Sequence, residues 1–262
     1  MAGMREVKIV RIDVQTRTTK KITDHVAEEK PLFIFLNKAH YATILCLPAN
    51  LKELVVGHLL TEGIIKTIVD IEDLSLKEGA CHVKLRRNVD LRKRLKLSGM
   101  NSRVILSACG SPSPYRYAGR LPKIRSSLTL RGEILSDCVN RLNSAAELFR
   151  KTGGVHAAAI HRADGTVVAF AEDVGRHNAV DKVIGMAALD ETDFSECFLV
   201  LSGRLTADIV RKAARVGLPI VASLAAAIDS GIETANAARL TLVGFVRGKR
   251  MNVYTVPERI IP

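Results

Sequence analysis

The chain has 262 residues, with 39 Lys or Arg against 27 Asp or Glu, which gives a formal net charge of +12. Its 47% hydrophobic and 25% charged residues are typical of a globular protein and exclude a disordered, tail-like chain. No apolar run approaches the roughly 20 residues that span a bilayer, and the charged N-terminus lacks the apolar block of a signal peptide. We therefore expect a cytoplasmic protein that does not enter membranes.

The first hundred residues mix predicted strands with one helix. Apolar residues on one face predict a helix over 51–62, with Asn50 as its N-cap. Alternating or continuous apolar residues predict strands at 6–14, 32–36, 42–47, 71–75, 81–85 and 103–107. This region, 1–107, is expected to form a smaller, mixed α+β lobe.

A segment without clear periodicity follows at 108–133, and we interpret it as a long loop, which in a compact protein is usually functional or disordered. Ser136 is expected to cap the next helix, which should continue to residue 150 and end at Gly153-Gly154. The residues expected to face inward on that helix are Val139, Leu142, Ala145, Ala146 and Phe149.

Strands and helices then alternate, which predicts an α/β lobe over 134–262 with a mostly parallel sheet. The expected helices are 177–188, 206–216 and 230–238. The expected strands are 155–160, 166–171, 198–202, 219–224, 240–246 and 252–255. The Ala163-Asp164-Gly165 sequence between the first two strands is a turn signal.

Cys109 is the first candidate for chemistry. It lies in a Gly- and Pro-containing loop followed by basic residues, including Arg116, Arg120 and Arg125. Neighbouring cations lower the pKa of a thiol and so favour the nucleophilic thiolate. An inert loop cysteine explains the position equally well. The other cysteines lie in apolar periodic segments and are expected to be small core residues: Cys46, Cys81, Cys138 and Cys197.

A second candidate is the segment 172–185, in which Gly175-Arg176-His177-Asn178 opens a predicted helix. A helix N-terminus attracts anions, and His177 could bind a phosphate or transfer a proton. The alternative is that Asn178 or Asp173 simply caps the helix. A metal site is a weaker idea, because His156 and His161 are expected on opposite faces of a strand.

Two further candidates follow predicted strands. Ser202-Gly203-Arg204 occupies a strand–helix junction, where parallel sheets bind ligands. Phe245-Val246-Arg247-Gly248-Lys249-Arg250 combines a flexible glycine with three cations suited to phosphates, although a plain basic hairpin turn is equally consistent. The densest basic run, 84–96, is interpreted as a solvated face.

Taken together, several long segments resemble the formate dehydrogenase accessory protein family, FdhD. They appear in the same order along most of the chain: LPANLKELVVGHLLTEGII (47–65), the cysteine segment 107–111, TGGVHAAAI (152–160), EDVGRHNAVDKVIG (172–185), LSGRLTADIVRKAARVGLPIVAS (201–223) and LTLVGFVRGKRMNVYT (240–255).

The resemblance implies a sulfurtransferase that acts as a sulfur carrier. A cysteine desulfurase would pass persulfide sulfur to Cys109, and the protein would deliver it to the molybdenum bis-molybdopterin guanine dinucleotide cofactor of formate dehydrogenase. It implies cofactor binding at Phe245 to Arg250, where a guanine nucleotide should mimic the cofactor. It also implies a cytidine-deaminase-like C-terminal lobe and a homodimer.

The chain departs from the family pattern in one place. Gly110, Ser111 and Pro112 follow Cys109, so the second cysteine of the usual CGxCG pair is absent. A single thiolate still suffices for attack on a sulfane sulfur. The deaminase zinc signature H-x-E is also missing, because Ala157 and Ala158 follow His156, and no zinc or other metal is expected.

Two alternatives come from other functional classes. A cofactor-binding chaperone without sulfur transfer would tolerate Cys109→Ser but not changes at Arg247 or Lys249. A nucleic-acid-binding protein would use the basic run, but the chain has no Trp and no interleaving of aromatic with basic residues for base stacking. We do not expect nucleic acid as a partner.

Overall fold

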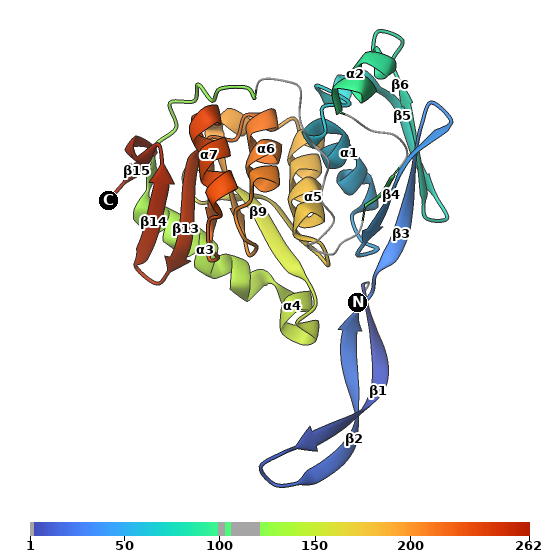
Figure 1. Cartoon of the computed structure of the whole chain (residues 1–262), viewed down its shortest axis with the longest axis vertical. Coiled ribbons are helices and arrows are strands. Elements are labelled where there is room, and N and C mark those ends of the chain that lie inside the picture. Colours follow the sequence, from blue (N-terminus) through green and yellow to red (C-terminus); the bar gives the residue numbers. More distant parts are fainter. Residues whose placement is uncertain (1–2, 99–102, 106–120) are drawn as a thin grey trace.

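Two β-sheets share a set of helices, and a two-stranded hairpin projects from the body they form (Figure 1). This arrangement comes from a computed structural model that describes residues 3–98, 103–105 and 121–262. Within those ranges, none of the helices combines the length and apolar character needed to cross a bilayer.

The N-terminal half contains the hairpin and a five-stranded sheet with the order β5-β6-β3-β4-β7. Its elements are β1 (Met4–Asp13), β2 (Thr18–Ala27), β3 (Lys30–Leu36), β4 (Ala39–Cys46), α1 (Leu51–Thr61), β5 (Ile71–Lys77), β6 (Ala80–Leu85), α2 (Leu91–Ser98) and β7 (Arg103–Ile105). The β3–β4 turn forms where Asn37 and Lys38 adopt positive φ angles of 48° and 74°.

The C-terminal half is built on a six-stranded sheet with the order β10-β9-β11-β12-β13-β14. Its elements are β8 (Leu130–Arg131), α3 (Gly132–Ala145), α4 (Glu147–Thr152), β9 (His156–Arg162), β10 (Val167–Asp173), α5 (Arg176–Leu189), β11 (Cys197–Leu201), α6 (Ala207–Val216), β12 (Ile220–Ser223), α7 (Asp229–Ala238), β13 (Thr241–Arg247), β14 (Arg250–Thr255) and β15 (Ile260–Ile261). Figure 1 shows α5, α6 and α7 on one face of this sheet and α3 on the other.

The expected mostly parallel sheet is wrong. Only β11–β12 and β12–β13 are parallel, whereas β10–β9, β9–β11 and β13–β14 are antiparallel. Tight turns join β9 to β10 and β13 to β14, and a tight turn can connect only antiparallel neighbours. The coarser expectation of a mixed α/β fold is confirmed. The likeness of residues 134–262 to cytidine deaminases stays a prediction.

Helix α1 joins the two halves by crossing α5 at two glycines. A Cβ on Gly57 would lie 1.8 Å from the carbonyl oxygen of Asp181, and one on Gly185 would lie 1.9 Å from that of Glu53. The backbones therefore approach more closely than any side chain allows. The largest hydrophobic core surrounds this crossing and takes residues from both sheets, so both halves share it. The domain limits at 107 and 134 stay a prediction.

Several local expectations are corrected. Asn50 precedes α1 in a left-handed conformation and its side chain makes no capping hydrogen bond. Ser136 lies inside α3, which begins at Gly132, and its hydroxyl donates to the carbonyl oxygen of Gly248. The helix expected to continue to residue 150 ends at Ala145, and a second helix, α4, begins at Glu147. Ala145 and Phe149 were expected to face inward, but Ala145 is exposed and Phe149 is 47% exposed. The strand β2 and the helix α2 were not predicted.

Candidate functional site

The carboxyl ends of β11, β12 and β13 meet at one edge of the six-stranded sheet, because these three strands are neighbours and parallel. The loops after them are bonded to one another. The hydroxyl of Ser223 donates to the carbonyl oxygen of Gly203 at 2.7 Å, and the amide of Phe245 donates to that of Ala225 at 3.0 Å. The candidate segments 202–204 and 245–250 therefore lie at the same edge of the sheet. We call this edge, formed by the loops that follow β11, β12 and β13, the carboxyl edge.

Ser202 and Gly203 are held in place by the neighbouring strand and helix. The Ser202 hydroxyl accepts from the amide of Ala157 at 3.0 Å and lies 3.3 Å from Nδ1 of His156. A Cβ on Gly203 would come within 3.0 Å of the Arg176 side chain, so the glycine lets this arginine pack against the loop. The sequence-predicted junction thus brings a serine, a histidine and a buried arginine together, while Arg204 is exposed.

His177 enters the same edge from the first turn of α5. Burial, with the charges of Lys212 and Arg176, lowers its pKa to about 3, so the imidazole is neutral at physiological pH. Its Nε2 is buried without a hydrogen-bond partner among the described residues, as is the hydroxyl oxygen of Thr206 at the start of α6. The predicted phosphate contact at His177 stays a prediction, and a neutral imidazole could serve it only as a hydrogen-bond donor.

Phe245 to Arg250 forms the end of β13, a turn and the start of β14. Gly248 turns with φ 56°, and Phe245 has φ 51°, which is rare for a residue with a side chain. The Arg247 guanidinium lies 5.5 Å from the centre of the Phe245 ring. Arg247, Lys249 and Arg250 are exposed, and none takes part in an ion pair within the described ranges. The turn therefore presents a cluster of cations beside an aromatic ring at the carboxyl edge.

The acidic residues Glu172 and Asp173 of the 172–185 segment bind backbone amides of neighbouring elements. Glu172 accepts from the amides of Leu148 and Phe149 at 3.1 and 2.8 Å, which caps α4. Asp173 accepts from the amide of Gly175 at 2.9 Å, but α5 has no side-chain capping hydrogen bond, so the expected capping by Asn178 or Asp173 is wrong. His156 bonds to Ser202 in the loop after β11, whereas His161 bonds to the β9–β10 turn, which is consistent with the expected opposite faces.

A second buried network joins three helices. Lys212 of α6 lies 2.8 Å from the carboxylate of Asp181 in α5, and Nδ1 of His58 in α1 lies 3.4 Å from the same carboxylate. Burial alone would raise the pKa of Asp181, but Lys212 and His58 hold it below its usual value. Sequence reasoning missed this network, because its partners lie 31 and 123 residues apart and no local pattern marks them.

Four of the five cysteines are buried and free: Cys46, Cys81, Cys138 and Cys197. Burial raises the pKa of all four, that of Cys46 to about 12 and that of Cys81 to about 11. Their thiols stay protonated and shielded at physiological pH, which confirms their expected role as core residues. Cys109, together with Arg116 and Arg120, lies outside the described residues.

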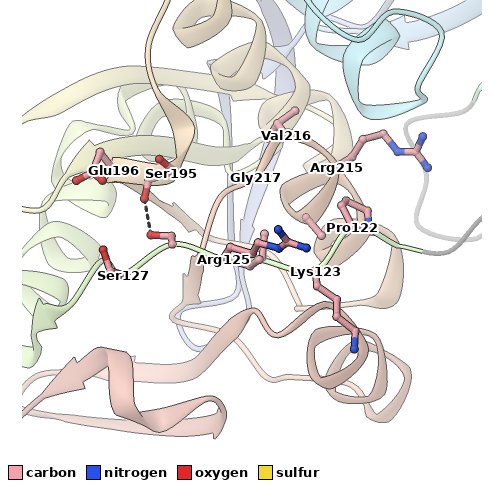
Figure 2. A pocket seen from close by; sticks show the side chains of 12 residues that line it. Pro122, Lys123, Arg125, Ser127, Ser195, Glu196, Arg215, Val216 and Gly217 are labelled. Carbon is pink, nitrogen blue, oxygen red and sulfur yellow. Dashed lines mark hydrogen bonds between the residues drawn. The ribbon is translucent and has the colours of Figure 1, made fainter.

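A pocket of about 520 Å³ lies at the other end of the same strands, beside the residues that precede β11 and β12. Figure 2 shows its wall, where the Ser126 hydroxyl donates to the carbonyl oxygen of Ser195 at 2.7 Å. Lys123 and Arg125 line it from the chain segment 122–127, and Arg215 lines it from the end of α6. The pocket is therefore lined with basic side chains. The segment 122–127 that supplies two of them begins 13 residues after Cys109 in the sequence.

Comparison with known proteins shows which family the chain is similar to. The model of the FdhD/NarQ family matches residues 27–261. A sulfur carrier protein FdhD from Sulfolobus acidocaldarius is 38% identical over 259 residues, covering 98% of both chains. One from Staphylococcus aureus is 35% identical and covers 91% of this chain and 90% of its own. A crystal structure of a protein from Desulfotalea psychrophila, described as a formate dehydrogenase accessory protein, covers 99% of this chain and all of its own, with TM-score 0.79 and 27% identity.

Proposed function

Because the chain belongs to the FdhD/NarQ family, we propose that it is a sulfur carrier that serves formate dehydrogenase. In this proposal Cys109 accepts sulfur from a cysteine desulfurase, and the protein then delivers it to the molybdenum bis-molybdopterin guanine dinucleotide cofactor. The protein acts in the cytoplasm, as a homodimer, and both the desulfurase and the dehydrogenase are its partners. A deaminase-like C-terminal lobe is part of the same proposal.

The observation that carries the assignment to Cys109 is the burial of every other cysteine. A thiol must ionise and be reached by its partner to accept sulfur. Cys46 and Cys81 fail on both counts, because burial raises the pKa of each thiol to about 12 and about 11. Cys138, the next cysteine after Cys109 along the chain, is buried within α3.

The first step needs one thiolate and no external redox partner. The Cys109 thiolate attacks the outer sulfur of the desulfurase persulfide, a new S–S bond forms, and the S–S bond within the donor breaks. The desulfurase cysteine leaves as a thiolate, and Cys109 now carries the persulfide with its proton. The exchange is balanced in atoms and electrons, so the absence of a second cysteine at 110–112 does not prevent it.

The turn from Phe245 to Arg250 suits an anionic cofactor with guanine nucleotide arms. Arg247, Lys249 and Arg250 are exposed and offer charge to phosphates, and Phe245 offers a ring face at the same edge. The exposed Arg204 of the neighbouring loop is a further candidate there. We propose that the cofactor binds along the carboxyl edge with this turn as its main contact.

Intact-mass spectrometry tests the sulfur-carrier assignment. The protein is incubated with an active cysteine desulfurase and cysteine, and the wild type is compared with Cys109→Ser and with Cys138→Ser as a matched control. We expect the wild type and Cys138→Ser to gain the mass of one sulfur atom, removable by a reductant, and Cys109→Ser to gain none. An adduct retained in Cys109→Ser would contradict the assignment.

The chaperone alternative makes the opposite prediction in cells. If the protein only holds and inserts the cofactor, Cys109→Ser would leave formate dehydrogenase active while Arg247→Ala would not. The missing second cysteine is the observation that favours this alternative. Measuring formate dehydrogenase activity in cells that carry either variant as their only copy separates the two functions.

A further inference from the structure

The basic pocket that Figure 2 shows has no part in the proposed function. It has a volume of about 520 Å³ and lies at the end of the strands β11 and β12 opposite the carboxyl edge. One wall is the chain segment 122–127, which we call the basic wall. The residues before β11 and the end of α6 form the rest. Because the pocket and the carboxyl edge lie at opposite ends of the strands, a molecule bound in one leaves the other open.

The basic wall keeps a fixed path, although it has no strand partner among the described residues. The amide of Ile124 donates to the carbonyl oxygen of Ala238 at 2.8 Å, and the Ser126 hydroxyl donates to that of Ser195 at 2.7 Å. The guanidinium of the buried Arg259 donates to the carbonyl oxygen of Ser126 at 3.4 Å. Three other segments of the chain therefore hold this wall, so a ligand would not have to order it on binding.

Exposure alternates along the basic wall, which is the pattern of an extended chain. Ile124 is buried and Ser126 is half-buried, whereas Lys123, Arg125 and Ser127 are exposed. Alternate side chains of an extended chain lie on the same side, about 6–7 Å apart. Neither Lys123 nor Arg125 takes part in an ion pair within the ranges that the structure describes. The wall thus offers two regularly spaced cations to a partner.

The other charges of the pocket also favour an anionic ligand. Arg215 adds a third cation from the last turn of α6, where it offsets the partial negative charge of that helix end. Glu196 is the single carboxylate among the described residues that line the pocket. Figure 2 shows the charged ends of Lys123, Arg125 and Arg215 spread along the pocket rather than meeting at one point. This arrangement suits several carboxylates in a row better than one phosphate group.

Two other occupants fit the pocket less well. The chain's own segment 106–120 contains Arg116 and Arg120 but no carboxylate, so it lacks the charge to bind there. Nucleic acid would bring phosphates, but the described lining of the pocket contains no aromatic ring on which a base could stack. An acidic peptide needs only cations for its carboxylates, and its extended backbone fits beside an extended wall.

We propose that this pocket binds an extended, acidic segment of a partner protein. Carboxylates at alternate positions of that segment pair with Lys123 and Arg125, and a further one pairs with Arg215. The exposed hydroxyl of Ser127 donates to the same segment. Exposed ion pairs are individually weak, so the site relies on several pairs in register, and the affinity should fall as salt is added. The inference does not depend on the sulfur chemistry, because neither Cys109 nor the carboxyl edge takes part in it.

Fluorescence anisotropy with labelled peptides tests the register of the site. The first peptide is Thr-Glu-Thr-Glu-Thr-Glu, and the second, Glu-Glu-Thr-Thr-Glu-Thr, has the same charge but no two carboxylates at alternate positions. At low ionic strength we expect the first to bind at least about threefold more tightly, because only its carboxylates share the spacing of Lys123 and Arg125. The neutral peptide Thr-Gln-Thr-Gln-Thr-Gln should not bind. Absence of binding by the first peptide, or equal binding of the two acidic peptides, would overturn the proposal.

Matched double variants test the position of the site. Lys123→Ala/Arg125→Ala should weaken binding of the alternating Glu peptide about tenfold. Both residues are exposed, so the variant should keep the Tm of the wild type. Arg92→Ala/Lys93→Ala removes the same charge from α2, where both side chains are also exposed, and should leave the affinity unchanged. Equal losses in the two double variants would show that net charge alone attracts the peptide, which would contradict a specific pocket.

A third variant should bind the peptide more tightly than the wild type does. Glu196→Gln removes the carboxylate that opposes the ligand and should raise the affinity about two- to threefold, a gain that damage to the fold cannot produce. Unchanged or weaker binding would count against the proposed charge pairing. A thymidine oligonucleotide that binds more tightly than the peptide, and that loses affinity in Lys123→Ala/Arg125→Ala, would assign the pocket to nucleic acid instead.

Discussion

The Nζ atom of Lys182 lies 2.7 Å from the carboxylate of Asp173, and both side chains are completely buried. The same two side chains hold the N-terminal half, since Asp173 accepts from the amide of Leu47 at 3.0 Å and Lys182 donates to the carbonyl oxygen of Leu47 at 3.2 Å. The segment that the sequence marks for chemistry therefore also fixes the strand β4 and its following loop against α5.

Removing one member of this ion pair should be costly. Asp173→Ala leaves the ammonium of Lys182 buried without its counter-charge, which should lower the free energy of unfolding by about 3–5 kcal/mol. Urea denaturation followed by circular dichroism measures the change. The double variant Asp173→Leu/Lys182→Met should recover only part of the loss, because no buried charge remains but the amides of Leu47 and Gly175 still lack the acceptor that Asp173 supplied. A single variant as stable as the wild type would show that the pair is not buried in solution.

The neutral His177 should make the protein sensitive to acid. Its folded pKa of about 3 lies below the ordinary value of 6.5, so between these values the unfolded chain binds a proton that the folded chain does not. Stability from this group is complete above about pH 6.5 and is lost as the pH falls toward 3. The free energy of unfolding of His177→Gln, measured in urea between about pH 4 and 6, should have a slope shallower by up to about 1.4 kcal/mol per pH unit. If the wild type and His177→Gln had equal slopes, the His177 imidazole would be exposed to water rather than buried.

The crossing of α1 and α5 should tolerate no added side chain. Gly185→Ala would place a Cβ 1.9 Å from the backbone of Glu53, so the helices would have to separate, with an expected loss of about 1–3 kcal/mol or more. Gly154→Ala is the matched control, because its Cβ would meet only ordinary contacts at 3.4 Å and beyond. Thermal unfolding of both variants compares them. Similar Tm values for the two would contradict the close approach.

Guanine nucleotide binding should depend on the turn between β13 and β14. We expect Arg247→Ala and Lys249→Ala each to weaken binding of GDP about tenfold, because each removes a charge available to the phosphates. Arg162→Ala removes another exposed arginine, at the opposite end of the sheet, and should leave the affinity unchanged. Isothermal titration calorimetry gives the three dissociation constants. A larger loss in the Arg162 variant would move the nucleotide site away from the turn.

Thiol labelling should single out one cysteine. Iodoacetamide at neutral pH should modify Cys109 in the folded protein and leave Cys46 and Cys81 untouched, because burial raises the pKa of these two thiols and shields them. Peptide mapping after labelling, repeated in urea, identifies the modified residues. All five should react once the chain is unfolded. Labelling of a buried cysteine at the rate of Cys109 in the native protein would contradict this expectation.

Most regular elements could be predicted from local patterns, whereas pairing between distant strands could not. The strands at 198–202 and 219–224 are continuous apolar runs, and the structure has β11 and β12 there. Strand β2 escaped prediction because Thr, Lys and Asp dominate it, and its pairing with β1 supplies what its side chains do not. The direction of β9 relative to β11 depends on how the chain returns to the sheet, and local patterns do not encode that.

The candidate site was only partly readable from the sequence. Strand–turn–helix junctions predict ligand-binding edges, and Ser202-Gly203 and the Phe245–Arg250 turn do lie on loops bonded at one edge. The acidic and histidine-rich character of 172–185 suggested a ligand, but Asp173 and Asp181 are satisfied by Lys182 and Lys212. A carboxylate that binds a ligand and one that neutralises a buried lysine look alike until the lysine is located.

The glycine crossing between α1 and α5 limits how this protein can be divided or recombined. A fragment that begins at residue 134 would expose the α5 surface that α1 covers, including the backbone at Gly185, which no side chain shields. A chimera that takes its first half from one relative and its second from another must bring matching glycines to both helices, or the two halves will not close. Substitutions on one helix at this crossing are therefore constrained by the other, and the two segments should vary in concert among the protein's relatives.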